Sequence, residues 1–131
     1  GFAVRDKASL VLLTSLNSTA DRTSSLFPNP GYQFGQFVIN VTARASTDAG
    51  PVVNVQGLVP GTTGTYYTIL SSTAIGTSST SDAVTELMHV GPGWSTAANK
   101  RAAAVLPSQF RVTTSYASTT DTTYSVGVHL A

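Results

Sequence analysis

The sequence predicts an all-β fold: an antiparallel β-sandwich or jelly roll of about seven or eight strands. Three observations support this prediction. Several short segments alternate apolar and polar residues with period two, which is typical of half-buried strands. Clusters of Gly, Pro, Asp, Ser and Thr separate these segments and favour turns. No segment shows the 3.6-residue periodicity of a strong amphipathic helix.

The clearest strand begins at Phe37. One face of this segment carries Phe37, Ile39, Val41, Ala43 and Ala45. The other face carries Val38 and otherwise polar residues, which gives the period of two expected of a strand. The same reasoning applied along the chain predicts seven strands, the fifth of which ends in a glycine-proline turn: 8–16, 37–45, 52–58, 65–70, 84–93, 108–116 and 122–131.

The turns between these strands predict how they pair. Residues 46–51, "STDAGP", are short enough for 37–45 and 52–58 to form a hairpin, and residues 117–121 join the last two strands. We expect most neighbouring strands to pair in this way. Tyr66 and Tyr67 are consecutive on a strand, so we expect one of them in the core. Residues 94–107 are rich in alanine but lack a helical stripe, which predicts a loop or a short helical turn.

Length and composition indicate one folded domain, residues 8–131, preceded by an extended arm over residues 1–7. Hydrophobic residues make up 41% of the 131-residue chain and the net charge is +1, which argues against disorder. Only 10% of residues are charged, against roughly 25% in ordinary globular domains. No signal peptide is visible, and a start at Gly1 fits either loss of an initiator Met or processing.

The composition and the charge also argue against several classes of function. The basic residues are spread along the chain, and only Lys100 and Arg101 are adjacent, so we expect no nucleic-acid partner. No apolar run is long enough to span a bilayer, and we expect no membrane partner. The absence of cysteine excludes thiolate catalysis and leaves the redox compartment open. We expect His89 and His129 to be surface or edge residues, and we predict no metal, no cofactor and no enzymatic activity.

The aromatic residues leave one alternative open. Trp94, Tyr32, Tyr66 and Tyr67 could line a sugar-binding platform, as in carbohydrate-binding modules built on a β-sandwich. Core or interface positions are the favoured interpretation. A carbohydrate-binding or adhesion module therefore stays as an alternative function, and the loss of glycan binding on Trp94→Ala would support it.

Two long stretches resemble a known class of proteins. Residues 37–70, "FVINVTARASTDAGPVVNVQGLVPGTTGTYYTIL", and residues 89–131, beginning "HVGPGWSTAANKRAAAVLPSQFRV", are similar to small virion proteins of tailed bacteriophages. The order of the pieces carries the resemblance: a strand ending in "NVTA", a small-residue turn, "VNVQG", a glycine-proline-glycine turn, and a last alternating strand. It covers roughly residues 34–131.

The resemblance implies a head decoration, or cement, protein of the β-sandwich type. Such a protein binds the outer surface of the phage head, contacts the major capsid protein and stabilises the capsid without an active site. Another structural position in the phage, in the tail, neck or baseplate, stays an alternative. We also expect a homo-oligomer, either a dimer or a trimer, because small sandwiches must protect their edge strands.

On this hypothesis the arm and the proline-rich stretch 26–36 supply the contacts. Extended segments can add to the edge of a neighbouring sheet or become ordered on binding. Apolar side chains would anchor them and basic side chains would pair with acids of the capsid. The candidate capsid or subunit interface is Phe2, Val4, Arg5, Lys7, Arg22, Leu26, Phe27, Tyr32 and Trp94.

Overall fold

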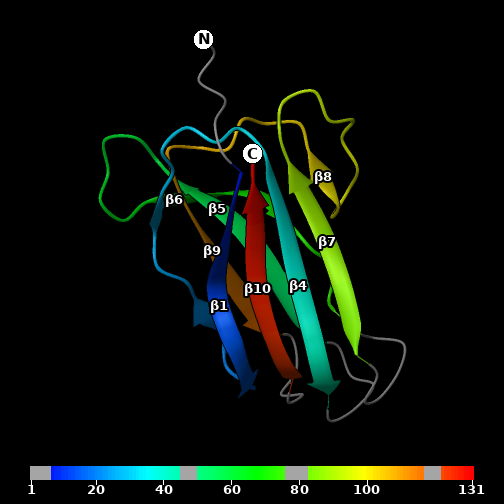
Figure 1. Ribbon diagram of the computed structural model, residues 1–131. Coiled ribbons are helices and arrows are strands. Elements are labelled where there is room, and N and C mark those ends of the chain that lie inside the picture. Colours follow the sequence, from blue (N-terminus) through cyan, green and yellow to red (C-terminus); the bar gives the residue numbers. More distant parts are fainter. Residues whose placement is uncertain (1–6, 45–49, 76–82, 117–121) are drawn as a thin grey trace.

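The computed structural model describes residues 7–44, 50–75, 83–116 and 122–131. These residues form ten strands in two sheets that pack face to face, which confirms the predicted all-β sandwich (Figure 1). None of them lies in a helix, so the described part of the chain holds no helix that could cross a bilayer.

Each sheet has five strands. In spatial order, the first sheet, here sheet A, contains β1 (Ala8–Ser18), β10 (Thr122–Leu130), β4 (Gly35–Arg44), β7 (Val84–Val90) and β8 (Arg101–Ala102). The second, sheet B, contains β2 (Arg22–Thr23), β9 (Gln109–Tyr116), β5 (Pro51–Leu58) and β6 (Tyr66–Ser71), and β3 (Phe27–Pro28) also pairs with β9. Three of the ten strands have only two residues, which leaves seven long strands at the seven predicted places.

The strand pairing is that of a jelly roll. The first long strand pairs with the last, β1 with β10, and the short β2 and β3 pair with β9. Inside these pairs, β4 pairs with β7 and β5 with β6. All of these pairs are antiparallel. This is expected of a jelly roll, in which two halves of the chain pair as one antiparallel ribbon that wraps around to form two sheets. The short β8 adds a parallel edge beside β7.

Two of the expected hairpins are wrong. Strands β4 and β5 lie in different sheets, and so do β9 and β10. Alternation identifies the buried face of each strand, but it does not identify the partner strand. Here the connections cross from one sheet to the other, so that the apolar faces of β4 and β5 meet across the core instead of lying side by side. The expected pairing of 52–58 with 65–70 is confirmed as β5 with β6.

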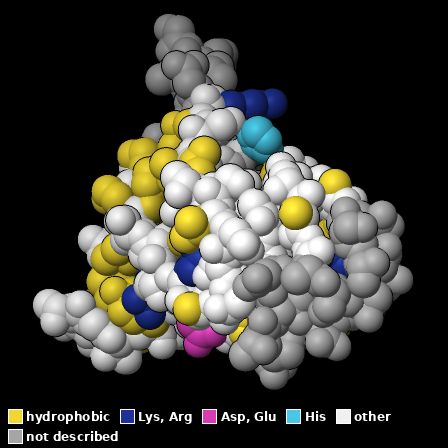
Figure 2. Space-filling view, turned by 90° about the horizontal axis from the view of Figure 1, so that it is seen from below, with side chains coloured by type: hydrophobic (Ala, Val, Ile, Leu, Met, Phe, Trp, Pro, Cys, Tyr) yellow, Lys and Arg dark blue, Asp and Glu magenta, His cyan; other side chains and the backbone are white. Residues whose placement is uncertain are grey.

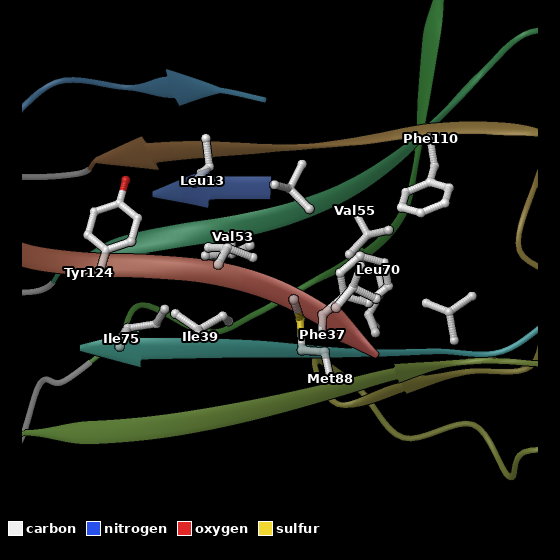
Figure 3. Packing of buried hydrophobic residues seen from close by; sticks show 14 of the residues in the cluster. Leu13, Phe37, Ile39, Val53, Val55, Leu70, Ile75, Met88, Phe110 and Tyr124 are labelled. Atoms are coloured by element: carbon white, nitrogen blue, oxygen red, sulfur yellow. The ribbon is translucent and has the colours of Figure 1, made fainter. Parts of the chain in front are cut away.

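The core lies between the sheets and is formed by the inward residues of both. The side chains of Phe37, Ile39 and Val41 on β4 are fully buried, as predicted. Phe37 meets Phe110 of sheet B edge to face, with ring centroids 6.0 Å apart. Figure 3 shows the labelled core side chains pointing into the space between the two sheets. The buried cluster also includes Leu13, Val53, Val55, Leu70, Ile75, Met88, Val90, Leu106, Val112, Tyr124, Val126, Val128 and Leu130.

A β-bulge near the end of β4 changes which residues face inward. Val41 pairs with Tyr124 and Ala43 pairs with Thr123, so Thr42 is an extra residue on β4. The bulge shifts the alternation by one residue. Ala43 is therefore exposed and Arg44 is buried. The expectation that Ala43 faces the core was wrong, and Ala45 lies outside the described residues.

The tyrosine pair also differs from the prediction. Tyr66 lies on the outer side of sheet B beneath the Arg111 guanidinium, whose carbon is 3.4 Å from the ring centroid. Tyr67 lies over Gly57 and remains 43% exposed, so neither tyrosine joins the buried cluster. The segment 94–107 is a loop that contains β8, in agreement with the predicted lack of a regular helix.

A buried polar bridge links the two sheets. The Thr114 hydroxyl of β9 lies 2.8 Å from the Tyr124 hydroxyl of β10. The same Thr114 oxygen accepts a hydrogen bond of 2.9 Å from the backbone N–H of Arg22. The Arg22 guanidinium in turn donates to the backbone oxygens of Tyr124 and Thr14 and covers the Tyr124 ring. The bridge therefore connects polar groups of four strands, β1, β2, β9 and β10.

We predict that Thr114→Val lowers the free energy of unfolding by about 1–3 kcal/mol, because Tyr124 and the Arg22 N–H lose a buried partner. The two side chains have nearly the same shape, so packing is preserved. Thr113→Val is the matched control, since Thr113 is half-buried and accepts only a 3.4 Å hydrogen bond from Asn54. Urea denaturation of both variants measures the difference, and equal losses would contradict the bridge.

Candidate functional site

A row of polar side chains crosses the outer face of sheet A. The strand register aligns Ser9 of β1 with His129 of β10, and His129 with Gln36 of β4. Gln36 aligns with His89 of β7, and His89 with Arg101 of β8. These residues alternate with core residues along their strands, so the pleat places them on the outer side. We call them the polar row.

Hydrogen bonds hold both imidazoles of the polar row. The Ser9 hydroxyl lies 2.7 Å from Nδ1 of His129. Nε2 of Gln36 lies 3.1 Å from Nε2 of His89, so that with the amide as donor the imidazole nitrogen accepts. Each histidine is thus oriented by a neighbour on the next strand, and each keeps one ring nitrogen that these hydrogen bonds do not use.

An aromatic wall stands beside the polar row. The Trp94 ring tilts against His89, with centroids 5.3 Å apart, and Trp94 is 39% exposed. Trp94 and Phe34 both pack over Gly91. A Cβ added at Gly91 would overlap Phe34 Cδ1 and would lie 2.6 Å from Trp94 Nε1. The absence of a side chain at Gly91 therefore allows the indole to lie close to the backbone in a defined position.

The polar row and the aromatic wall enclose a pocket of about 470 Å³. It lies where β1 begins and β10 ends, at the upper end of sheet A in Figure 1. Lys7 and the start of β1 form one side, and Trp94 and Phe34 form another. Its polar lining consists of Lys7, Ser9, Gln36, His89 and His129, with no carboxylate side chain among the described lining residues.

The contact between Ser9 and His129 differs from that in a Ser-His-Asp triad. In a Ser-His-Asp triad the serine bonds Nε2 of the histidine, while a carboxylate bonds Nδ1 and orients the ring. Here Ser9 occupies Nδ1 of His129, and the described lining of the pocket supplies no acid for the other nitrogen. Within the described ranges, no three His, Asp or Glu side chains gather in a way that could hold a metal ion.

An apolar row lies beside the polar row on the same outer face. The register aligns Val11 with Gly127, Gly127 with Val38, and Val38 with Leu87. Val11 is 62% exposed and Leu87 45% exposed. Gly127 leaves a shallow hollow of about 250 Å³ between Val11 and Val38. We call these four residues the apolar row.

The outer face of sheet A also lacks charge in its middle. Beyond the apolar row, Ser125, Asn40 and Thr85 align as a third row of uncharged side chains. Seen from below, Figure 2 shows hydrophobic side chains gathered along one flank of the molecule, with Lys and Arg side chains at separate places in the same view. The outer face of sheet B differs, because Arg111 there stacks on Tyr66 and donates to Gln56.

The structure places the nine residues of the predicted interface in different surroundings. Phe2, Val4 and Arg5 lie outside the described residues. Lys7 and Trp94 come together at the pocket. Phe27 packs on Phe110, with ring centroids 5.1 Å apart, and Tyr32 packs against the same core. Leu26 is half-buried, and the hydrogen bonds of Arg22 go to the domain's own backbone.

Sequence reasoning missed the two rows on sheet A. One signal was present: Val38 is an apolar residue among the outward, mostly polar positions of its strand. The histidines were expected at the surface, where His129 is exposed and His89 half-buried. Their alignment with Ser9 and Gln36 depends on the jelly-roll register, which joins segments more than 50 residues apart in the chain.

Comparisons of the chain with protein-family models, with curated proteins and with solved structures gave no match.

We predict that Gly91→Ala displaces Trp94 from its position over the backbone, because the new Cβ overlaps the aromatic wall. Trp94 is the one tryptophan of the chain, so its emission should move to longer wavelength and become easier to quench with acrylamide. Gly64→Ala is the control, since a Cβ there meets no atom within 4 Å. Unchanged emission and quenching in Gly91→Ala would contradict this packing.

Proposed function

We propose that this protein is a non-enzymatic virion structural protein that decorates and stabilises a bacteriophage capsid by binding the outer surface of the major capsid protein lattice. The observation that carries the proposal is the outer face of sheet A, which combines an exposed apolar row with uncharged neighbours. The sequence resemblance to small phage virion proteins supplies the partner.

The apolar row has the chemistry of a protein-docking surface. Val11 is 62% exposed and Leu87 is 45% exposed. Burying either side chain against a partner would contribute about 1 kcal/mol to the free energy of binding. Single exposed apolar residues are ordinary, but four aligned positions with a hollow between two of them form a continuous feature. A side chain of the partner could enter the hollow at Gly127, because no Cβ occupies that position.

The edge of sheet A offers a second mode of attachment. β1 is the outermost strand, is eleven residues long and pairs with β10 alone among the described strands. Val11 and Leu16 of this strand are both exposed, at 62% and 53%. An unpaired edge can accept a strand from another chain, either a capsid segment or a second copy. This edge supports the proposed homo-oligomer as well as the proposed capsid contact.

Low charge suits a protein that binds in many copies at short distances, because like charges on neighbours would repel. The fold agrees with the proposal, since jelly rolls include viral capsid domains, but they also include lectin domains. A position in the tail, neck or baseplate would use the same surface against another virion protein.

We predict that Leu87→Asp weakens binding to purified phage heads at least about tenfold, because a carboxylate would be buried against the apolar row. Leu87 is exposed enough for the fold to survive, which thermal unfolding checks. Co-sedimentation with heads of candidate tailed phages, stripped of decoration where possible, measures binding.

Thr68→Asp is the matched control, since it adds the same charge at an exposed position of β6 in sheet B. Equal binding of Leu87→Asp and Thr68→Asp would contradict docking through sheet A. Absence of binding by the unaltered protein to every head preparation would overturn capsid decoration itself.

A further inference from the structure

We propose that the pocket beside the polar row binds a saccharide that carries a carboxylate, such as a hexuronate unit of a surface polysaccharide. This inference does not depend on the proposed capsid role, because the pocket lies on the free domain and can be tested with the isolated protein. It rests on three features of the pocket: the aromatic wall, the line of hydrogen-bonding groups, and the sign of the charge.

The aromatic wall provides a platform for a sugar ring. The partly apolar face of a pyranose packs on an exposed indole, and such pockets pair an aromatic surface with a few polar groups that fix orientation. Trp94 is exposed on the pocket side of a loop, yet its position is defined by contact with Gly91 and His89. A platform held in this way loses little conformational freedom on binding.

The polar row provides the hydrogen bonds. Neighbouring strands lie about 4.8 Å apart, so His129, Gln36 and His89 present polar groups over about 10 Å. The hydrogen bonds to Ser9 and Gln36 orient both imidazoles before any ligand arrives. Nε2 of His129 is the nitrogen that the Ser9 bond does not use, and His129 is an exposed residue.

The charge of the pocket selects the kind of saccharide. Lys7 lines the pocket and carries a positive charge. No described lining residue carries a carboxylate side chain. Among the described lining residues an ammonium group of an amino sugar would meet no carboxylate side chain, whereas the carboxylate of a uronic acid would meet Lys7 and the imidazoles. The pocket therefore favours an acidic sugar over a neutral or a basic one.

Tryptophan fluorescence tests the proposal directly, because the single tryptophan lies in the pocket. The probes are tetrasaccharides of galacturonate, of mannuronate and of hyaluronan, with cellotetraose and maltotetraose as neutral counterparts. We expect saturable change in Trp94 emission with at least one acidic probe, and binding that weakens as salt is added. The neutral probes should bind at least about tenfold more weakly.

Variants distinguish binding in the pocket from nonspecific binding elsewhere on the protein. Gln36→Ala and His129→Ala should each weaken binding of the responding probe at least about tenfold, while Ser125→Ala, on the same face of β10, should not. If one of the pocket variants unfolds, the other still gives the test. The proposal is overturned if no acidic probe binds, if neutral probes bind equally well, or if acetate or sulfate alone produces the same change.

Discussion

The alternation of side chains along β10 is the constraint on which the rest of the molecule depends. Thr122, Tyr124, Val126, Val128 and Leu130 are all buried, and the residues between them face outward. β10 lies between β1 and β4 and is hydrogen-bonded to both, so its register sets theirs. A slip of one residue would turn five core positions to solvent, which makes any other register costly.

The register of β10 also determines which residues lie next to one another on the outer face of sheet A. When the odd-numbered residues of β10 face solvent, His129 falls between Ser9 and Gln36, and Gly127 falls between Val11 and Val38. The polar row and the apolar row are thus consequences of the packing that forms the core. The two rows are neighbours on the same face of sheet A. The pocket, with its polar and aromatic walls, therefore lies next to the apolar row, which we propose contacts another protein. The proposed docking surface and the proposed ligand pocket therefore lie at adjacent levels of one sheet.

Much of the fold could be predicted from the sequence, because period-two alternation is a local property. The inward positions of Phe37, Val53, Val55, Phe110 and Tyr124 follow from it. Strand partners could not be predicted, since alternation is the same whether β4 and β5 pair or face each other. The bulge at Thr42 could not be predicted from the sequence either, because one extra residue in a strand leaves no signal in the composition. The candidate site is assembled by long-range register, so the sequence indicated Trp94 and Lys7 but not the histidines that lie beside them.

The most direct test of docking through sheet A is a labelling footprint on the head-bound protein. The chain has no cysteine, so a single cysteine at Leu87 or at Thr68 gives one reactive site on each sheet. We predict that heads strongly slow maleimide labelling of Leu87→Cys and leave labelling of Thr68→Cys unchanged. Protection of Thr68→Cys with free labelling of Leu87→Cys would contradict it and would assign the contact to sheet B.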